Sequence, residues 1–365
     1  MMIAIVAPLV SAIREPQRGG SQAFISDLTR GLVDRGHEVH LYAASGSEVP
    51  GVEVIDTGVD HRALAATLYR ASAVAVTPAL GVAEKAFARV YAAVREARYD
   101  VVHNHAFDAP AIRLATALRA PVLHTLHLPP DAAVADALRH VVQRDPPPTV
   151  AVVSARQASA WRQIVPVDEI LPPCVPTGVI RWSPSAGDRA LFAGRLSPEK
   201  GAGEAIEIAQ AASVGIDVYG DSYDAEYTRE QIDPRRAEPG VAIREGVPRT
   251  ELWEVMARAA VVLCPAKWEE PFGMVAAEAQ ACGTPVVAFR RGALDEVILD
   301  GVTGFLVTPD DIDAAAEAVA RTAELSRSEC RKHAEHQLDL EPSLDAHERL
   351  YRRVASAGLE AAIGG

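Results

Sequence analysis

The stretch Val261–Phe289 constrains the fold most, because it reads as one complete strand–loop–helix–strand step. It opens with a short apolar run, Val261–Cys264, which predicts a buried strand. The segment Met274–Cys282 consists mostly of Ala, Met, Glu and Gln, and it predicts a helix that ends at Gly283. A second apolar run closes the stretch. A helix between two buried strands is typical of a parallel sheet, so the chain is predicted to be an α/β protein.

The loop before this helix carries the residues that could bind a ligand. In a parallel α/β sheet the ligand lies beyond the carboxyl ends of the strands, and a helix N-terminus there offers free N–H groups to a phosphate. Gly273 would let a ligand approach the backbone closely. Glu270 and Glu278 are separated by seven residues, and about 2.2 helical turns would place them on roughly one face. Such carboxylates suit sugar hydroxyls; the alternative is one capping acid and one solvated surface acid.

The sequence EPFGMVAAEAQACGTPVVA, which begins at Glu270, resembles the signature of the retaining glycosyltransferases of family 4. That family has two Rossmann-like domains, the GT-B fold. The resemblance implies that Glu270 lies by the donor sugar and that Glu278 holds the donor ribose. It also implies that the sugar and phosphate meet the backbone of four residues, namely Phe272, Gly273, Met274 and Val275.

The composition limits the class of protein. A chain of 365 residues is too long for one ordinary α/β core and predicts about two domains. A hydrophobic content of 49% with 23% charged residues is typical of a soluble globular protein. The net charge of −13 argues against broad nucleic-acid binding, which needs a basic face. Any phosphate site must therefore be locally basic.

The cysteines and the hydropathy pattern predict a cytoplasmic protein. No apolar run approaches the roughly 18 residues of a transmembrane helix, and residues 1–6 are too short for a signal-peptide core. Reversible docking on a membrane surface stays compatible with this pattern. The cysteines show no paired spacing, which favours a reducing cytosol. They are Cys174, Cys264, Cys282 and Cys330.

A glycine-containing loop follows the first predicted strand, residues 3–8. Gly19, Gly20 and Ser21 would place flexible backbone and a helix N-terminus at the edge of a sheet, with Ser21 as the N-cap. The alternative is a capped loop without a ligand. The three residues resemble the family's first-domain glycine loop, which meets the donor diphosphate and borders the acceptor. This resemblance implies donor contacts for Gly19 and Gly20 and an acceptor-side place for Ser21.

Four histidines gather where two further strands are predicted to end: His103, His105, His124 and His127. Alternate residues of a strand share a face, so a metal site is one hypothesis, although no carboxylate or Cys completes a set. Another is that polar residues are tolerated where strands leave the core. The resemblance implies a third reading, in which His127 lies near the reacting sugar. His105 would then line the acceptor side.

A second loop, residues 194–201 with the sequence GRLSPEKG, follows a short apolar strand. Arg195 offers a planar fork for phosphate oxygens and Lys200 offers a point charge. The alternative is two solvated surface charges. The loop resembles the family's diphosphate-binding loop, which implies that both cations neutralise the leaving diphosphate. Arg244 matches, by position only, the place where the family's backbone meets the nucleobase.

A Pro-rich stretch, residues 170–179, predicts the linker between two domains. We expect an N-terminal acceptor-side domain over 1–175, joined by a C-terminal helix at about 343–365 that crosses back, and a nucleotide-sugar domain over 176–342. The resemblance implies that the domains face each other across a cleft. The family usually has Asn-Gly in the linker, where this chain has Pro173-Cys174, so the resemblance implies no donor contact from this loop.

The resemblance implies a retaining enzyme that moves a sugar from a nucleotide-diphosphate donor to an acceptor hydroxyl. In the family mechanism, front-face displacement, the departing phosphate takes the acceptor proton, and neither a metal nor a cofactor is needed. Two alternatives keep the fold: a phosphorylase or a sugar-nucleotide epimerase. A non-catalytic sugar-nucleotide sensor is a third. The donor base and sugar, the acceptor and the oligomeric state do not follow from the sequence.

Overall fold

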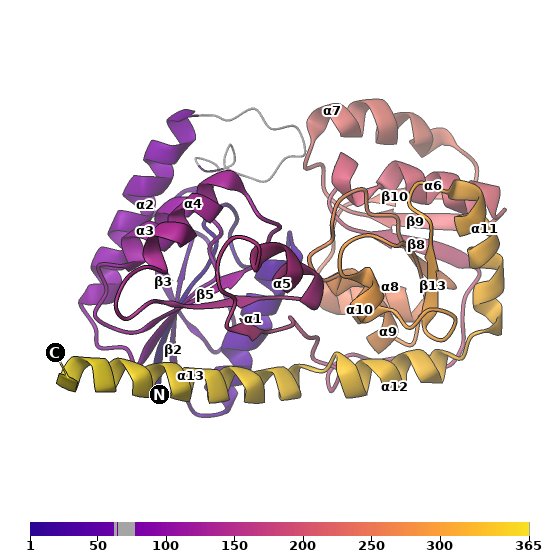
Figure 1. Ribbon diagram of the computed structural model, residues 1–365. Coiled ribbons are helices and arrows are strands. Elements are labelled where there is room, and N and C mark those ends of the chain that lie inside the picture. Colours follow the sequence, from indigo (N-terminus) through magenta and orange to yellow (C-terminus); the bar gives the residue numbers. More distant parts are fainter. Residues whose placement is uncertain (62–63, 65–76, 365) are drawn as a thin grey trace. The chain divides into compact units, whose positions relative to one another are not determined.

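The computed structural model describes residues 1–61, 64 and 77–364, which form two compact α/β units (Figure 1). The first unit comprises Met1–Arg14, Ser21–Pro172 and Glu341–Gly365, and the second comprises Glu15–Gly20 and Pro173–Leu340. The first unit gives way to the second after Pro172, three residues before the expected boundary at 175. The second unit ends at Leu340, two residues before the expected boundary at 342. The segment Glu15–Gly20, which we expected in the N-terminal domain, groups with the second unit.

The sheet of the first unit is parallel and has the strand order β3-β2-β1-β4-β5-β6-β7. The strands are β1 (Met2–Val6), β2 (Glu38–Ala43), β3 (Glu53–Asp56), β4 (Val101–Asn104), β5 (Val122–Leu126), β6 (Thr149–Val152) and β7 (Glu169–Ile170). The order reverses between β1 and β4, where Ile5 is paired with His103. Ligands of open α/β sheets bind beyond the carboxyl ends of the strands at such a reversal.

The helices of the first unit cover this sheet with amphipathic faces. They are α1 (Gly20–Asp34), α2 (Thr77–Arg95), α3 (Ala109–Ala115), α4 (Ala132–Val141), α5 (Ala155–Trp161) and α13 (Leu340–Gly364). In α1, Phe24, Leu28 and Leu32 recur every four residues and are fully buried, as expected for one apolar helix face. A helix was expected from about 61 to 97; residues 62–63 and 65–76 of that stretch lie outside the described residues.

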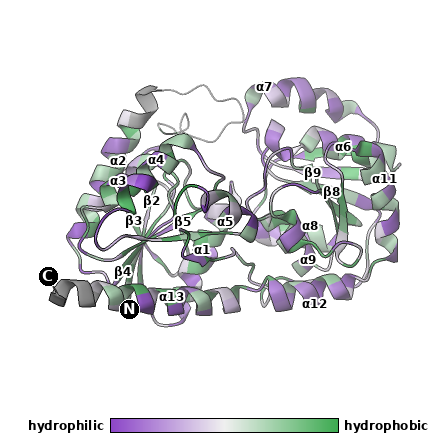
Figure 2. Cartoon of the chain, in the orientation of Figure 1, coloured by the Kyte–Doolittle hydropathy of each residue, from purple (hydrophilic) through white to green (hydrophobic). Residues whose placement is uncertain are grey.

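The sheet of the second unit is also parallel, with the order β10-β9-β8-β11-β12-β13. Its strands are β8 (Arg189–Ala193), β9 (Gly215–Tyr219), β10 (Val241–Arg244), β11 (Val261–Cys264), β12 (Val286–Phe289) and β13 (Gly304–Val307). The order reverses between β8 and β11. Figure 2 shows hydrophobic residues concentrated on the strands of both sheets, such as β4, β5, β8 and β9. This arrangement confirms the predicted α/β fold with two Rossmann-like parts.

The helices of the second unit alternate with its strands. They are α6 (Ala202–Ala211), α7 (Ala225–Tyr227), α8 (Arg249–Arg258), α9 (Met274–Ala281), α10 (Leu294–Val297), α11 (Ile312–Arg321) and α12 (Arg327–Gln337). Four short non-α turns add to them: η2 (Pro198–Lys200), η3 (Thr228–Ile232), η4 (Asp233–Ala237) and η5 (Thr322–Glu324). Among the described residues, no helix has both the length and the hydrophobicity to cross a bilayer.

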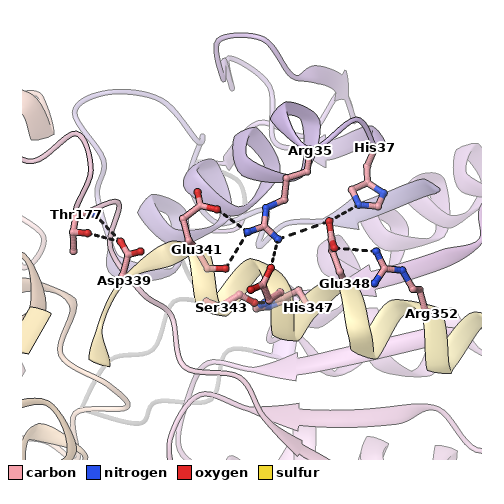
Figure 3. Close-up of polar contacts among 10 residues, drawn as sticks. Arg35, His37, Thr177, Asp339, Glu341, Ser343, His347, Glu348 and Arg352 are labelled. Atoms are coloured by element: carbon pink, nitrogen blue, oxygen red, sulfur yellow. Dashed lines mark hydrogen bonds and ion pairs between the residues drawn. The ribbon is translucent and has the colours of Figure 1, made fainter. Parts of the chain in front are cut away.

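The C-terminal helix α13 returns to the first unit, as predicted, although it starts at Leu340 rather than near 343 (Figure 3). Leu344 packs so closely on α1 that a Cβ on Gly31 would lie 2.5 Å from its Cδ1. Arg35, near the end of α1, donates to Glu341 at 2.6 Å and to Asp345 at 2.7 Å. A glycine contact and an ion-pair network therefore fix the first turns of α13 to α1.

Candidate functional site

Two loops of the second unit leave its sheet where the strand order reverses. One follows β8 and contains η2, and the other follows β11 and leads into α9. Both loops start at the carboxyl ends of neighbouring strands, which is where a parallel sheet binds its ligands. The GRLSPEKG loop and the residues from Trp268 to Gly273 therefore lie at the same edge of one sheet.

The second of these loops ends at the N-terminus of α9. Gly273 precedes the first helical residue with φ of 110°, in the left-handed region that favours glycine. A Cβ there would also lie 2.7 Å from Cδ2 of Leu294. Phe272 and Met274 are buried, and Val275 is half-buried. The first amides of α9 have no helical acceptor, so this turn can accommodate an anion.

Glu270, in the loop before α9, is held by two donors that meet one of its oxygens. Nζ of Lys200 lies 2.7 Å from Oε2, and the indole Nε1 of Trp268 donates to Oε2 at 2.8 Å. The Lys200 ammonium also lies 4.8 Å from the centre of the Trp268 ring. Oε1 of Glu270 accepts no hydrogen bond from the described residues. The carboxylate is thus anchored through one oxygen and can accept a ligand hydroxyl with the other.

Arg195, in the loop after β8, is anchored in a similar way. Its Nη2 donates to Oε1 of Glu199 at 3.3 Å, and its guanidinium lies 4.3 Å from the centre of the Tyr223 ring. The Glu199 side chain is 3% exposed, whereas that of Arg195 is 24% exposed. The buried carboxylate therefore orients a cation that still reaches the surface.

Glu278, on α9, pairs with a different cation. Nε of Arg249 donates to its Oε1 at 3.0 Å, and Nη2 of Arg249 lies 2.9 Å from the same oxygen. The helix α9 begins at Met274, as predicted, so Glu278 lies on the helix and Glu270 precedes it. Because Glu270 lies outside the helix, the 3.6-residue period does not relate the two carboxylates.

The charges of these groups cancel. Three cations and three carboxylates form three ion pairs, so their sum is 3 − 3 = 0: Arg195, Lys200, Arg249, Glu199, Glu270 and Glu278. The two loop cations that we predicted to meet a diphosphate are therefore already paired with carboxylates. Each keeps spare capacity, because an ammonium has three N–H donors and a guanidinium has five. The α9 N-terminus adds partial positive charge.

The other predicted donor contacts are more scattered. Gly19 and Gly20 belong to the segment that groups with the second unit, and Gly20 is the first residue of α1. Ser21 is the second residue of α1, and its hydroxyl donates to Oε1 of Gln22 at 3.0 Å. The prediction that Ser21 caps the helix is therefore wrong. Arg244 ends β10 with a side chain that is 56% exposed, 3.8 Å from Asp217.

Histidines form a buried cluster at the carboxyl ends of β4 and β5 in the first unit. Nδ1 of His105 lies 2.8 Å from Nε2 of His127, and the ring of His103 is 3.8 Å from that of His105. His347 of α13 joins the cluster, with its ring centre 5.8 Å from that of His103. His124, also fully buried, contacts Nδ2 of Asn104 at 3.1 Å. The fold thus brings together the predicted residues His105 and His127.

Burial keeps these imidazoles neutral. It lowers the pKa of His127 to about 4 and the pKa of His105 well below its ordinary value, with neighbouring histidines adding to both shifts. A neutral His127 can donate or accept a hydrogen bond with a sugar hydroxyl, but it supplies no charge near pH 7. In the described part of the chain, no three His, Cys, Asp or Glu side chains converge as metal ligands.

Three residues that contact and orient the predicted site residues were not predicted from the sequence. Glu199 orients Arg195, Trp268 donates to Glu270, and Arg249 pairs with Glu278. A weak signal existed for Arg249, because a carboxylate on a helix of mostly Ala needs a nearby cation when it is buried. Nothing in the linear sequence showed that the cation would come from the start of α8.

Two protein families together match most of the chain. Residues 183–337 match the family described as Glycosyl transferases group 1, and residues 18–179 match Glycosyltransferase Family 4. A D-inositol 3-phosphate glycosyltransferase of Geodermatophilus obscurus is 30% identical over 366 aligned residues, which cover 87% of this chain and 81% of that protein. The two matched segments meet between residues 179 and 183, close to the boundary between the two units.

Solved structures share the fold. Sucrose-phosphate synthase from Thermosynechococcus elongatus superposes with a TM-score of 0.79 at 20% identity, over 98% of this chain and all (100%) of that one. HepE from Anabaena, in complex with UDP and glucose, gives a TM-score of 0.73 at 20% identity, over 96% of this chain and 99% of that one. At this identity the likeness concerns the fold alone.

Proposed function

The chain belongs to the glycosyltransferases of group 1 and family 4, and from that premise we propose that it is a retaining enzyme with a nucleotide-diphosphate-sugar donor. It moves the sugar to an acceptor hydroxyl. The observation that carries this proposal is the cluster of Lys200, Trp268 and Glu270 beside the N-terminus of α9. A cation, a carboxylate and free backbone amides at one sheet edge suit a sugar diphosphate.

In the proposed reaction, the bond between the anomeric carbon and the β-phosphate oxygen breaks. The acceptor oxygen bonds to the same face of that carbon, and the departing phosphate takes the acceptor proton. Lys200, Arg195 and the α9 N-terminus stabilise the negative charge that develops on the diphosphate. Lys200 can do this without leaving Glu270, because it holds two further N–H donors.

The carboxylates and His127 have positioning roles in this proposal. Oε1 of Glu270 accepts a hydroxyl of the donor sugar, and Glu278 accepts the ribose hydroxyls. His127 is hydrogen-bonded to His105 through Nε2, so its Nδ1 is the ring nitrogen left for the reacting sugar. His105 and Ser21 border the acceptor. We further propose that the two loop cations replace a divalent metal, so that catalysis needs neither metal nor cofactor.

The relatives suggest which substrates to test first. HepE binds UDP and glucose, which supports a nucleotide-sugar donor. The relative from Geodermatophilus obscurus is named for D-inositol 3-phosphate, so a phosphorylated cyclitol is a reasonable first acceptor. The four cysteines are free thiols, which supports the proposal that the enzyme works in the cytoplasm.

A product assay tests the proposed function. The purified chain is incubated in EDTA with UDP-glucose, UDP-N-acetylglucosamine or GDP-mannose and a panel of acceptors that includes inositol 3-phosphate, and products are identified by mass spectrometry and NMR. We expect one donor and acceptor to give a glycoside with the donor's anomeric configuration. Inversion would contradict the retaining mechanism. Release of a sugar 1-phosphate that depends on inorganic phosphate would instead indicate a phosphorylase.

A further inference from the structure

The ion pair between Arg249 and Glu278 is unusual for its burial and its geometry. The side chains of Arg249 and Glu278 are 8% and 6% exposed. A carboxylate so far from water needs a cation or several hydrogen-bond donors to remain charged. Arg249 supplies them from the first residue of α8, which packs against α9.

Arg249 donates one hydrogen bond to Glu278, and a second nitrogen of its guanidinium lies close to the same carboxylate oxygen. Nε donates to Oε1 at 3.0 Å and Nη2 lies 2.9 Å from Oε1. Oε2 of Glu278 accepts no hydrogen bond from any described residue. An arginine that only neutralised this carboxylate would satisfy it best by bridging both oxygens. The observed contact fixes one oxygen and leaves the other for a ligand.

Arg249 is itself held in place, so it can set the direction of the carboxylate. Its guanidinium lies 4.8 Å from the centre of the Trp253 ring, one turn further along α8. Stacking on an aromatic face restricts a planar guanidinium, and the rigid fork then restricts its partner. A lysine at this position would keep the charge but lose both the plane and the fork.

We propose that Arg249 is a positioning residue that aims Oε2 of Glu278 at the ribose hydroxyls of the nucleotide donor. This inference rests on the proposed function, in which Glu278 receives the ribose. It adds that recognition of the ribose depends on a residue that does not touch the donor. The preference of the protein for a nucleotide with ribose hydroxyls over one without them therefore depends on Arg249.

The test measures this discrimination by calorimetric titration of the full chain in EDTA. UDP, GDP and ADP are each compared with their 2′,3′-dideoxy counterparts, and dTDP, which already lacks the 2′-hydroxyl, is compared with its 3′-deoxy counterpart. The hydrogen bonds of a carboxylate to ribose hydroxyls should make the preferred nucleotide bind about 10–100-fold more tightly than its dideoxy form. In Arg249→Lys the ratio of the two dissociation constants should fall toward one, because affinity for the hydroxyl-bearing nucleotide drops and affinity for the dideoxy form changes little.

Two further variants separate positioning from folding. Arg327→Lys removes a different buried guanidinium of the second unit, which donates to the carbonyls of Ala257 and Ala259. It should lower the thermal stability and leave the ratio as in the wild type. Arg249→Met combined with Glu278→Gln removes both charges of the pair together, which protects the fold from an unpaired buried charge. It should show the same low ratio as Glu278→Gln alone, because the two residues act as one unit.

The outcomes distinguish this inference from the proposed function. Wild-type protein that binds none of the four nucleotides overturns both. Wild-type protein that prefers the hydroxyl-bearing nucleotide, together with an Arg249→Lys variant that keeps the full ratio, overturns only the role of Arg249. An equal loss of affinity for both forms in Arg249→Lys also overturns it, because that result indicates a purely structural ion pair.

Discussion

The ammonium of Lys200 lies 2.7 Å from Oε2 of Glu270, and the two residues come from loops that follow neighbouring strands. The contact joins residues that are 70 positions apart in the sequence. It places a cation, which can meet a diphosphate, beside a carboxylate, which can meet a sugar. Neither residue could be positioned in this way by one loop alone.

Removing either loop cation should slow turnover strongly. We expect Arg195→Ala and Lys200→Ala each to lower kcat by about 10²–10³-fold, the usual effect of losing one preorganised charge donor. Lys267→Ala is the matched control, because Lys267 pairs with Glu204 and its side chain is 43% exposed. Steady-state kinetics of the three variants checks the prediction. Nearly full activity in Arg195→Ala would show that the diphosphate binds elsewhere.

The indole N–H of Trp268 should contribute to catalysis by orienting Glu270. Trp268→Phe keeps a ring beneath Lys200 and removes the donor to Oε2. We expect kcat/KM to fall about tenfold, as for a lost hydrogen bond to a charged group. Trp182→Phe, at a tryptophan of the second unit that is 39% exposed, is the control. Equal kinetics in Trp268→Phe and wild type would contradict the role of the indole.

The stability of the fold should fall as the pH drops below about 6.5. Burial lowers the pKa of His124, His127 and His347 to about 4 from 6.5. The unfolded chain therefore takes up protons between these values while the folded chain does not. Each such histidine makes the free energy of unfolding decrease by up to about 1.4 kcal/mol per pH unit as the pH falls. The stabilisation is fully present above pH 6.5.

Urea denaturation at pH 7.5, 6.0 and 5.0 measures this dependence. In His124→Gln the free energy of unfolding should decrease less as the pH falls, by the amount that one buried histidine contributes. We use His124 because it lies apart from the proposed substrate contacts and its pKa is lowered by burial alone. A free energy of unfolding that does not change between pH 7.5 and 5.0 would contradict the buried, neutral state of the cluster.

The hydroxyl of Tyr351 should stabilise the contact of α13 with the first sheet. It lies 2.7 Å from Nδ1 of His103, and both side chains are fully buried. Tyr351→Phe leaves this nitrogen without a partner, so the free energy of unfolding should decrease by about 1–3 kcal/mol. Equilibrium denaturation at pH 7.5 measures the change. A variant as stable as the wild type would show that the hydrogen bond contributes nothing net.

The ion pairs between α1 and α13 should matter less for global stability. Arg35 contacts Glu341 and Asp345, whose side chains are 68% and 57% exposed, and exposed pairs contribute about 0–1 kcal/mol each (Figure 3). We expect Arg35→Met to speed amide hydrogen exchange in the first turns of α13 and to leave the urea midpoint nearly unchanged. Unaltered exchange there would show that apolar packing alone fixes the start of the helix.

Much of the fold followed from the sequence, because it is encoded locally. Short apolar runs such as Val261–Cys264 and glycine helix ends such as Gly283 set the order of strands and helices, and the predicted α/β class is confirmed. The returning C-terminal helix was implied only by the family resemblance. The residues at which the chain passes from one unit to the other differ by a few positions from those expected. A Pro-rich stretch indicates a linker, but it does not determine at which residue the chain stops packing on one unit and starts packing on the other.

The site followed from the sequence only in part, because side-chain partners come from distant segments. The motif placed Lys200 and Glu270 on two loops, but their direct pairing needed the adjacency of β8 and β11. The helical period could not relate Glu270 to Glu278, because Glu270 lies outside α9. The cluster of His103 and His105 was visible as spacing along one strand, whereas the contribution of His347 was not, since it comes from α13.

Calorimetric titration of UDP, GDP, ADP and dTDP in EDTA is the most direct test of the proposed donor site. One nucleotide should bind the wild type and Lys267→Ala equally well without metal, and Glu278→Ala should weaken this binding by about tenfold or more. Absence of binding by all four nucleotides, or unchanged binding by Glu278→Ala, would contradict a donor site formed by the loops after β8 and β11 and by α9.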